Sequence, residues 1–258
     1  QCNEISKNTN QCLKCNSNKL EKKSLPCKIC IDSSKIEVQK LSNVLINDLG
    51  INQENIHVYF SGNEGFHVYV FNSQFQNLGS KERSELVDYI MFHGAIPETF
   101  GMKKFKPNRS LFPDFDQKGW NGRFSKQVYG SKSKRSKVIS ELLTNGYSSF
   151  QNTLDDVSQQ IGVKIDPNVT MDIHRIFRLP GSINSKSGLT KLLCTDITKF
   201  DPYNDACFLN DEPVEVLATC PIEFKLKNKK FGPFLNEKII VPTYAAAYLI
   251  CKKLATIA

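Results

Sequence analysis

Five of the nine cysteines fall within the first thirty residues of this 258-residue chain. Four of them form two CxxC pairs, Cys12 with Cys15 and Cys27 with Cys30. Each pair places two thiolates on one side of a turn, and two pairs complete the tetrahedral shell that zinc prefers. A segment this short cannot build its own apolar core, so a metal takes that role. We therefore predict a structural zinc-binding knob over residues 1–31, with Cys2 as an alternative ligand.

The other interpretation of these cysteines, a disulfide framework, requires an oxidising compartment. Nothing at the N-terminus resembles a signal peptide, and no apolar stretch is long enough to span a bilayer. We therefore expect a soluble protein with reduced thiols. The remaining cysteines lie among apolar residues and are predicted to be small buried side chains; they are Cys194, Cys207, Cys220 and Cys251.

Hydrophobic periodicity after the knob predicts one α/β (α+β) domain over residues 32–258. Predicted strands are Ile56–Phe60, Phe66–Phe71 and part of 214–241. Predicted helices are Ser33 or Ser34 to Leu49, Ser80–His93, Lys134–Thr144, Phe150–Ile161 and Thr243–Ile257. The stretch Lys103–Gly130 is rich in Gly, Pro and Asn, and it predicts a long ordered excursion or a mobile loop.

The first two strands flank a polar turn with the sequence SGNEGFH, Ser61–His67. Its two glycines allow close approach of a ligand, Ser61 offers a hydroxyl, and His67 offers a ring nitrogen. Such a turn suits phosphate oxygens. An ordinary hairpin turn explains the same residues, because it needs only one glycine or asparagine. The turn alone leaves both interpretations open.

The basic charge is concentrated in one segment, Lys103–Lys137. It holds eight lysines and three arginines against two aspartates, a local charge of +9 in a chain whose net charge is +8. Aromatic residues are interleaved with these cations: Phe105, Phe112, Trp120, Phe124 and Tyr129. Lysines neutralise phosphates and aromatic rings stack on bases, so we favour a nucleic-acid-binding surface over a solvated loop. Its candidate contacts are Lys103, Lys104, Lys106, Arg109, Arg123, Lys132, Lys134 and Arg135.

A second polar cluster lies between Asp166 and Leu189. Asp166 could hold a divalent metal, while Arg178 and Lys186 could neutralise a triphosphate. Ser182 and Asn184 could add neutral hydrogen bonds. The alternative is a loop of surface cations in which Asp166 and Asp172 only cap turns. Taken alone, this cluster favours the alternative.

The order of these features resembles the catalytic small subunit of archaeal and eukaryotic DNA primases. A Cys-rich knob is followed by a helix, the SGNEGFH hairpin, Asp166 and the PGSINSKSGL loop. The segments Phe200–Asp205 and Val241–Ile250 look like the closing part of that family, and the layout looks archaeal. The resemblance implies a mixed-sheet core flanked by helices. It also implies template-directed synthesis of short primers from nucleoside triphosphates on single-stranded DNA during replication, in the cytoplasm at the nucleoid.

The resemblance also implies roles for individual residues. The nucleotide would be held by Ser61, Gly62, Asn63, His67, Arg178, Ser182, Asn184 and Lys186. Asp166 and His67 would be catalytic, and Asp166 would bind Mg²⁺ or Mn²⁺, with Asp172 as second choice. Two divalent ions would lower the negative charge at the α-phosphate. A large primase subunit would be the partner.

Three features depart from that family. Glu64 stands where the family often has arginine, and Asn184 stands where it often has histidine. The family's paired aspartates lie just before the knob, whereas this chain starts at Gln1. Asp114 and Asp116 copy their spacing inside the basic segment, where the family has no metal ligands. We expect the true pair upstream of Gln1, and therefore little or no primer synthesis by residues 1–258 alone.

Two other classes of function stay open. A noncatalytic zinc and nucleic-acid binding module would keep the knob and the basic segment without needing a triphosphate pocket. A phosphohydrolase or ligase would use the same phosphate contacts, but it would normally show a nucleophile in its own motif, and none stands out.

Overall fold

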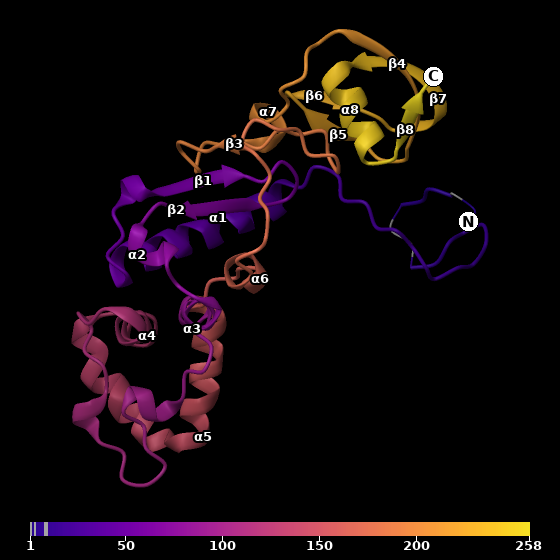
Figure 1. Cartoon of the computed structure of the whole chain (residues 1–258). Coiled ribbons are helices and arrows are strands. Elements are labelled where there is room, and N and C mark those ends of the chain that lie inside the picture. Colours follow the sequence, from indigo (N-terminus) through magenta and orange to yellow (C-terminus); the bar gives the residue numbers. More distant parts are fainter. Residues whose placement is uncertain (1, 3, 8–9) are drawn as a thin grey trace. The chain divides into compact units, whose positions relative to one another are not determined.

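A computed structural model describes residues 2, 4–7 and 10–258. The chain divides into two compact units (Figure 1). The first unit comprises residues 1–35, 57–69 and 177–258, and the second comprises residues 36–56 and 70–176. Helices and antiparallel sheets are mixed along the chain, which confirms the predicted α/β (α+β) class. Each described helix is too short or too polar to span a membrane.

The predicted hairpin is present. Strands β1 (Ile56–Phe60) and β2 (Phe66–Val70) lie side by side, and β3 (Leu192–Leu193) adds to the free edge of β1. The β1–β3 pairing is antiparallel, with Phe60 opposite Leu192. Phe60 is fully buried, because its ring packs between Phe66 and Phe200. This small sheet carries the polar turn at one end.

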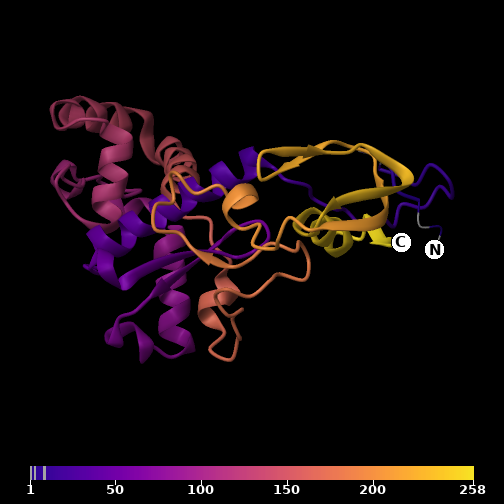
Figure 2. The same cartoon turned by 90° about the horizontal axis from the view of Figure 1, so that it is seen from above.

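The C-terminal part of the first unit is a second sheet covered by a helix (Figures 1 and 2). The strand order is β7-β4-β8, with a separate two-stranded sheet β5-β6. The elements are α7 (Pro202–Asp205), β4 (Pro213–Cys220), β5 (Phe224–Leu226), β6 (Lys229–Phe231), β7 (Phe234–Pro242), α8 (Thr243–Cys251) and β8 (Ala255–Ile257). Alternate residues of β4 are buried against α8.

The predicted closing helix Thr243–Ile257 is wrong at its end. Helix α8 stops at Cys251, and Lys253 adopts a positive φ of 56°. The following residues Ala255–Ile257 pair with Val216–Ala218 of β4. The unpaired edge of β4 offers backbone hydrogen bonds that a continued helix could not use.

The second unit is mainly helical. Its helices, together with the helix that leads into it, are α1 (Lys28–Asn43), α2 (Ser73–Gln76), α3 (Ser80–Met91), α4 (Gly119–Tyr129), α5 (Arg135–Ile161) and α6 (Pro167–Met171). Short 3₁₀ turns cover Gln53–Asn55, Pro97–Phe100, Arg109–Leu111 and Lys132–Lys134. The first predicted helix starts earlier than expected, at Lys28, and a π-helical turn (Val44–Asp48) extends it to where Gly50 takes a positive φ.

Helix α5 confirms the two helices predicted over 134–161. Gly146 has φ 81° and ψ 178°, so the helix is kinked where the sequence predicts a turn. The predicted loop Lys103–Gly130 instead contains α4. Phe124 on α4 is fully buried, with its ring centroid 4.4 Å from that of Phe100. Apolar packing against α5 therefore stabilises helix in a Gly- and Asn-rich sequence.

Candidate functional site

The SGNEGFH turn is a closed backbone loop. The Ser61 amide donates to the Gly65 carbonyl at 2.8 Å, and Ser61 Oγ accepts from the amides of Asn63 and Gly65 at 3.3 Å each. The hydroxyl therefore organises the turn. The amides of Ser61, Asn63 and Gly65 are thus satisfied within the turn.

Gly62 is where the turn meets the loop of residues 177–191. Its φ is +85°, and an added Cβ would lie 3.0 Å from Asn184 Cβ and 3.1 Å from the Leu189 carbonyl. Asn184 Nδ2 donates to the Ser61 carbonyl at 3.4 Å, and Ser187 Oγ donates to the Gly62 carbonyl. An added methyl at Gly65 would meet open space. Only the first of the two predicted glycines is thus required for close packing.

The structure brings the two predicted halves of a triphosphate pocket together in the first unit. Arg178 is half-buried, with one guanidinium nitrogen donating to the Ile183 carbonyl at 3.1 Å, and Lys186 is exposed. Neither side chain has an ion-pair partner among the described residues. Arg178 keeps further N–H groups, and Lys186 its whole ammonium, for an anionic ligand.

Two predicted donors of the loop have internal roles. Asn184 is buried, and its Oδ1 accepts from the Lys186 amide at 2.9 Å. Ser182 Oγ donates to the Leu179 carbonyl at 2.6 Å. Both side chains shape the loop that carries Arg178 and Lys186.

His67 lies at the start of β2, on the same hairpin. Its ring centroid is 6.4 Å from that of Phe177, which in turn lies 5.6 Å from the ring of Tyr69. Phe177 directly precedes Arg178. The aromatic contacts therefore hold the imidazole beside the segment that carries a predicted phosphate-binding cation.

Glu64, the acidic residue at the tip, does not face an open anion site. Its carboxylate accepts from Ser24 Oγ and lies 3.9 Å from Lys252 Nζ. Lys252 also donates to Asn63 Oδ1 at 3.3 Å. Burial lowers the pKa of Lys252, and the charge of Glu64 opposes that shift. Glu64 is thus held by a largely buried cation at the end of α8.

The predicted metal ligand Asp166 belongs to the second unit. It caps α6 by accepting from the Asn168 amide at 3.1 Å, and it lies 3.4 Å from the guanidinium of Arg175. Its alternative, Asp172, accepts from the His174 amide at 3.0 Å. Both carboxylates are exposed. Among the described residues, the one group of three or more clustered metal-ligand side chains is made of cysteines.

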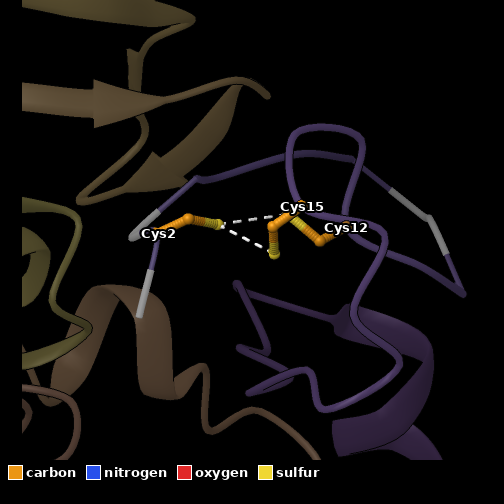
Figure 3. A group of neighbouring side chains, drawn as sticks. All are labelled: Cys2, Cys12 and Cys15. Carbon is orange, nitrogen blue, oxygen red and sulfur yellow. Dashed lines mark hydrogen bonds between the residues drawn. The ribbon is translucent and has the colours of Figure 1, made fainter.

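That group consists of Cys2, Cys12 and Cys15, whose sulfurs all lie within 4.8 Å of one another (Figure 3). Cys2 is 3.3 Å from each of the other two. Backbone amides are the main cause that lowers the pKa of Cys12 to about 7. The expectation of reduced thiols is wrong for the second CxxC pair, because Cys27 and Cys30 are bonded to each other as a disulfide, outside this group. The structure therefore gathers the alternative ligand Cys2 with the first CxxC pair.

The four scattered cysteines agree with the sequence prediction. Cys194, Cys207 and Cys220 are buried and Cys251 is half-buried. Burial raises the pKa of Cys194 to about 11 and that of Cys207 to about 12. These thiols are chemically quiet packing groups.

The prediction that aromatics of the basic segment stack on bases is wrong for most of them. Phe112, Phe124 and Tyr129 are at most 2% exposed and form the core of the second unit with Phe100 and Phe150. Trp120 stacks on Tyr89 and donates its indole N–H to the Tyr89 carbonyl at 2.8 Å. Phe105, 83% exposed, is the exception. Most aromatic side chains of this segment therefore form the core against which α4 and the 3₁₀ turns pack.

Several predicted nucleic-acid contacts make internal bonds instead. Arg123 Nε lies 3.1 Å from the buried carboxylate of Asp48, and Arg135 donates to the carbonyls of Phe112 and Pro113. Arg135 also pairs with Asp114. Lys132 pairs with Asp116, so both aspartates of the lookalike pair are engaged by cations. The cations that stay exposed are Lys103, Lys104, Lys106, Arg109, Lys132 and Lys134.

Sequence reasoning missed two buried residues of the loop, Ser187 and Lys191. Ser187 is 1% exposed and links the loop to Gly62, while Lys191 is 0% exposed. A signal for Lys191 was present, since it is a single cation in the mainly apolar segment 189–194. Charged residues are almost never fully buried without a partner, so such a position points to a specific contact.

Comparison with known proteins places these features in one family. The family model described as DNA primase small subunit matches residues 13–194. The chain is 77% identical to the DNA primase small subunit PriS of Nitrosopumilus maritimus, over all of this chain and 69% of that protein. It is 46% identical to PriS of Cenarchaeum symbiosum, over 96% of this chain and 66% of that protein. PriS of Methanococcoides burtonii is 30% identical, over 86% of this chain and 69% of that protein.

The chain thus spans about two thirds of the length of these archaeal relatives. The matched region includes the SGNEGFH turn and the whole loop that carries Arg178 and Lys186. The chain belongs to the DNA primase small subunit family, whose class of enzyme is the primase nucleotidyltransferase of DNA replication.

Proposed function

We propose that this chain binds a nucleoside triphosphate between the SGNEGFH turn and the loop of residues 177–191, as part of template-directed primer synthesis on single-stranded DNA. One observation carries the proposal. Gly62 lets the turn pack directly on the loop that carries Arg178 and Lys186, through the contacts of Asn184 and Ser187 with the Ser61 and Gly62 carbonyls.

Each side chain has a defined task in this proposal. Arg178 would neutralise phosphate oxygens with a planar guanidinium that can form two parallel hydrogen bonds. Lys186 would do so with a compact ammonium. His67 donates from the root of β2. Catalysis by such a site is mainly positioning and electrostatic stabilisation of the triphosphate.

The reaction also calls for divalent ions, Mg²⁺ or Mn²⁺, which would stabilise charge at the α-phosphate when bound. Asp166, the predicted ligand of such an ion, lies in the second unit and already pairs with Arg175. Among the described residues no further carboxylate joins it in a three-ligand cluster. The residues present do not by themselves fit such an ion, and we derive no step through it.

The cysteine group does fit a structural zinc ion. Three thiols within 4.8 Å of one another are the soft ligands that zinc prefers. Cys2, Cys12 and Cys15 would hold the ion, while Cys27 and Cys30 are bonded to each other outside this group. Metal analysis of Cys2→Ser and Cys30→Ser variants, with Cys207→Ser as control, tests this set. Zinc content unchanged by Cys2→Ser would contradict it.

The exposed cations of residues 103–134 support a surface for the single-stranded DNA template. A large primase subunit, as a heterodimer partner, and an association with the nucleoid of an archaeal cell complete the proposal on the strength of family membership.

The deciding experiment is a titration of the purified chain with ATP and dATP, alongside a single-stranded oligonucleotide. We expect His67→Ala and Lys186→Ala to weaken triphosphate binding about tenfold or more, since each removes a phosphate contact. Oligonucleotide binding should be unchanged. Wild-type protein that binds the oligonucleotide but no triphosphate would instead identify a noncatalytic zinc and nucleic-acid binding module. Primer synthesis assays with Mg²⁺ and with Mn²⁺ then measure what activity this chain has.

A further inference from the structure

Lys191 is the one lysine of the described residues whose side chain is completely buried. It directly precedes β3 in an otherwise apolar stretch. Taking an ammonium out of water is costly unless hydrogen bonds and nearby charge compensate for the lost solvation. No carboxylate of the described residues lies within 4.0 Å of this ammonium. The compensation must come from neutral groups.

Those groups come from both halves of the proposed pocket. Lys191 Nζ donates to the Tyr69 hydroxyl at 2.5 Å and to the Arg178 carbonyl at 2.8 Å. It also lies 5.4 Å from the centroid of the Tyr59 ring. The ring faces are electron-rich, which stabilises a desolvated cation.

The backbone of Lys191 makes a second set of contacts with the same loop. Its amide donates to the Ser182 carbonyl at 3.0 Å, and its carbonyl accepts from the Gly181 amide at 2.8 Å. The side chain of Lys191 donates to the carbonyl of Arg178, three positions before Gly181. The turn from Arg178 to Ser182 is therefore closed by Lys191 at both ends.

The hairpin side of this contact is equally specific. Tyr69 lies two residues after His67 on β2, and the Tyr59 and Tyr69 rings meet edge to face at 5.2 Å. Phe177 packs on both Tyr69 and His67. A displacement of the Arg178 segment would therefore disturb the ring that borders His67.

We propose that Lys191 is a positioning residue of the triphosphate pocket: its buried ammonium ties the Arg178 segment to the hairpin and so fixes where the Arg178 guanidinium is presented. The inference rests on the proposed function. An apolar side chain of the same length would fill the space, but it could not donate to the Arg178 carbonyl or the Tyr69 hydroxyl. A side chain with no exposed surface cannot itself contact the ligand.

The test compares Lys191→Met with Lys199→Met, the same change at a lysine 87% exposed. ATP binding is measured in the presence of Mg²⁺, and folding by thermal unfolding. We expect Lys191→Met to stay folded and to bind ATP about tenfold more weakly, while Lys199→Met behaves like wild type. ATP affinity unchanged by Lys191→Met overturns the inference.

A double-mutant cycle separates positioning from general structural damage. In an Arg178→Gln background, Lys191→Met should have little further effect on ATP affinity, because the group it positions is gone. In a Lys186→Met background it should still weaken binding about tenfold. Equal losses in both backgrounds would mean that Lys191 does not act through Arg178, and would overturn the inference.

Two further measurements cover the remaining outcomes. If Lys191→Met does not fold, Tyr69→Phe removes only the hydroxyl partner, and ATP affinity equal to wild type in that variant counts against the inference. If the wild-type chain binds no ATP, the proposed function fails. Amide hydrogen exchange without ligand then tests the positioning contact alone: Lys191→Met, or Tyr69→Phe in its place, should speed exchange at Gly181 and Ser182, and unchanged exchange overturns it.

Discussion

The loop of residues 177–191 and the basic segment 103–137 both mix cations with apolar side chains. They differ in whether those cations form bonds within the protein. In the loop, Arg178 and Lys186 are left without ion-pair partners among the described residues, and one buried lysine holds the backbone. In the basic segment, Arg123 and Arg135 are drawn into internal bonds and most aromatics enter the core. Residue type alone therefore does not identify a binding surface, because burial decides which groups remain for a ligand.

The largest effect should come from the core of the basic segment. Phe124→Ala should cost about 3–5 kcal/mol of unfolding free energy, because it empties a fully buried aromatic site. Phe105→Ala, at a ring 83% exposed, should leave stability within about 0.5 kcal/mol. Denaturant unfolding measures both. Equal stability of the two variants would contradict the assignment of Phe124 to the core and of Phe105 to the surface.

The next effect concerns the junction of turn and loop. Gly62→Ala should weaken ATP binding about tenfold and cost about 1–2 kcal/mol of stability, since a side chain is strained at φ +85°. The new Cβ would also press on Asn184 and Leu189. Gly65→Ala is the matched control, with open space around the added methyl, and both variants are compared by calorimetric titration. A Gly65→Ala variant as impaired as Gly62→Ala would show that flexibility, rather than close packing, matters in the turn.

A smaller effect should separate exposed from internal cations in the basic segment. Lys104→Ala should lower affinity for a single-stranded oligonucleotide a few-fold and reduce the slope of log affinity against log salt concentration by about 1. Arg123→Met should leave that slope unchanged and lower the melting temperature, because it leaves the Asp48 carboxylate buried and unpaired. Should Arg123→Met change the salt slope as Lys104→Ala does, Arg123 would have to reach the DNA.

The smallest effect is expected at Glu64. This side chain is 58% exposed, so Glu64→Gln should change stability by less than about 1 kcal/mol even though the Lys252 pair is lost. ATP affinity should change less than threefold, because the amide can still accept from Ser24. A tenfold gain in affinity on titration would show that Glu64 repels the triphosphate, as its position in place of the family's arginine first suggested.

Local elements followed from contiguous residues and their spacing. The hairpin around Ser61–His67, helix α3 and the break of α5 at Gly146 were predictable because turn residues, apolar periodicity and a positive φ act within a few positions. Helix α4 and strand β8 were not, since each depends on packing against another element: the α5 core for α4, and the open edge of β4 for β8. Long-range packing overrode the local Gly and Asn signal.

For the candidate site, the sequence by itself determined which residues could meet a triphosphate and which family they belong to. Ser61, His67, Arg178 and Lys186 carry the required chemistry, and motif order suffices to find them. Only the tertiary structure decided that Gly62 packs on the loop, that Asn184 bonds to the Ser61 carbonyl, and that Lys191 lies buried against Tyr69. The reason is physical: chemical type is a property of one residue, whereas burial and hydrogen-bond partners are set by segments more than a hundred positions apart.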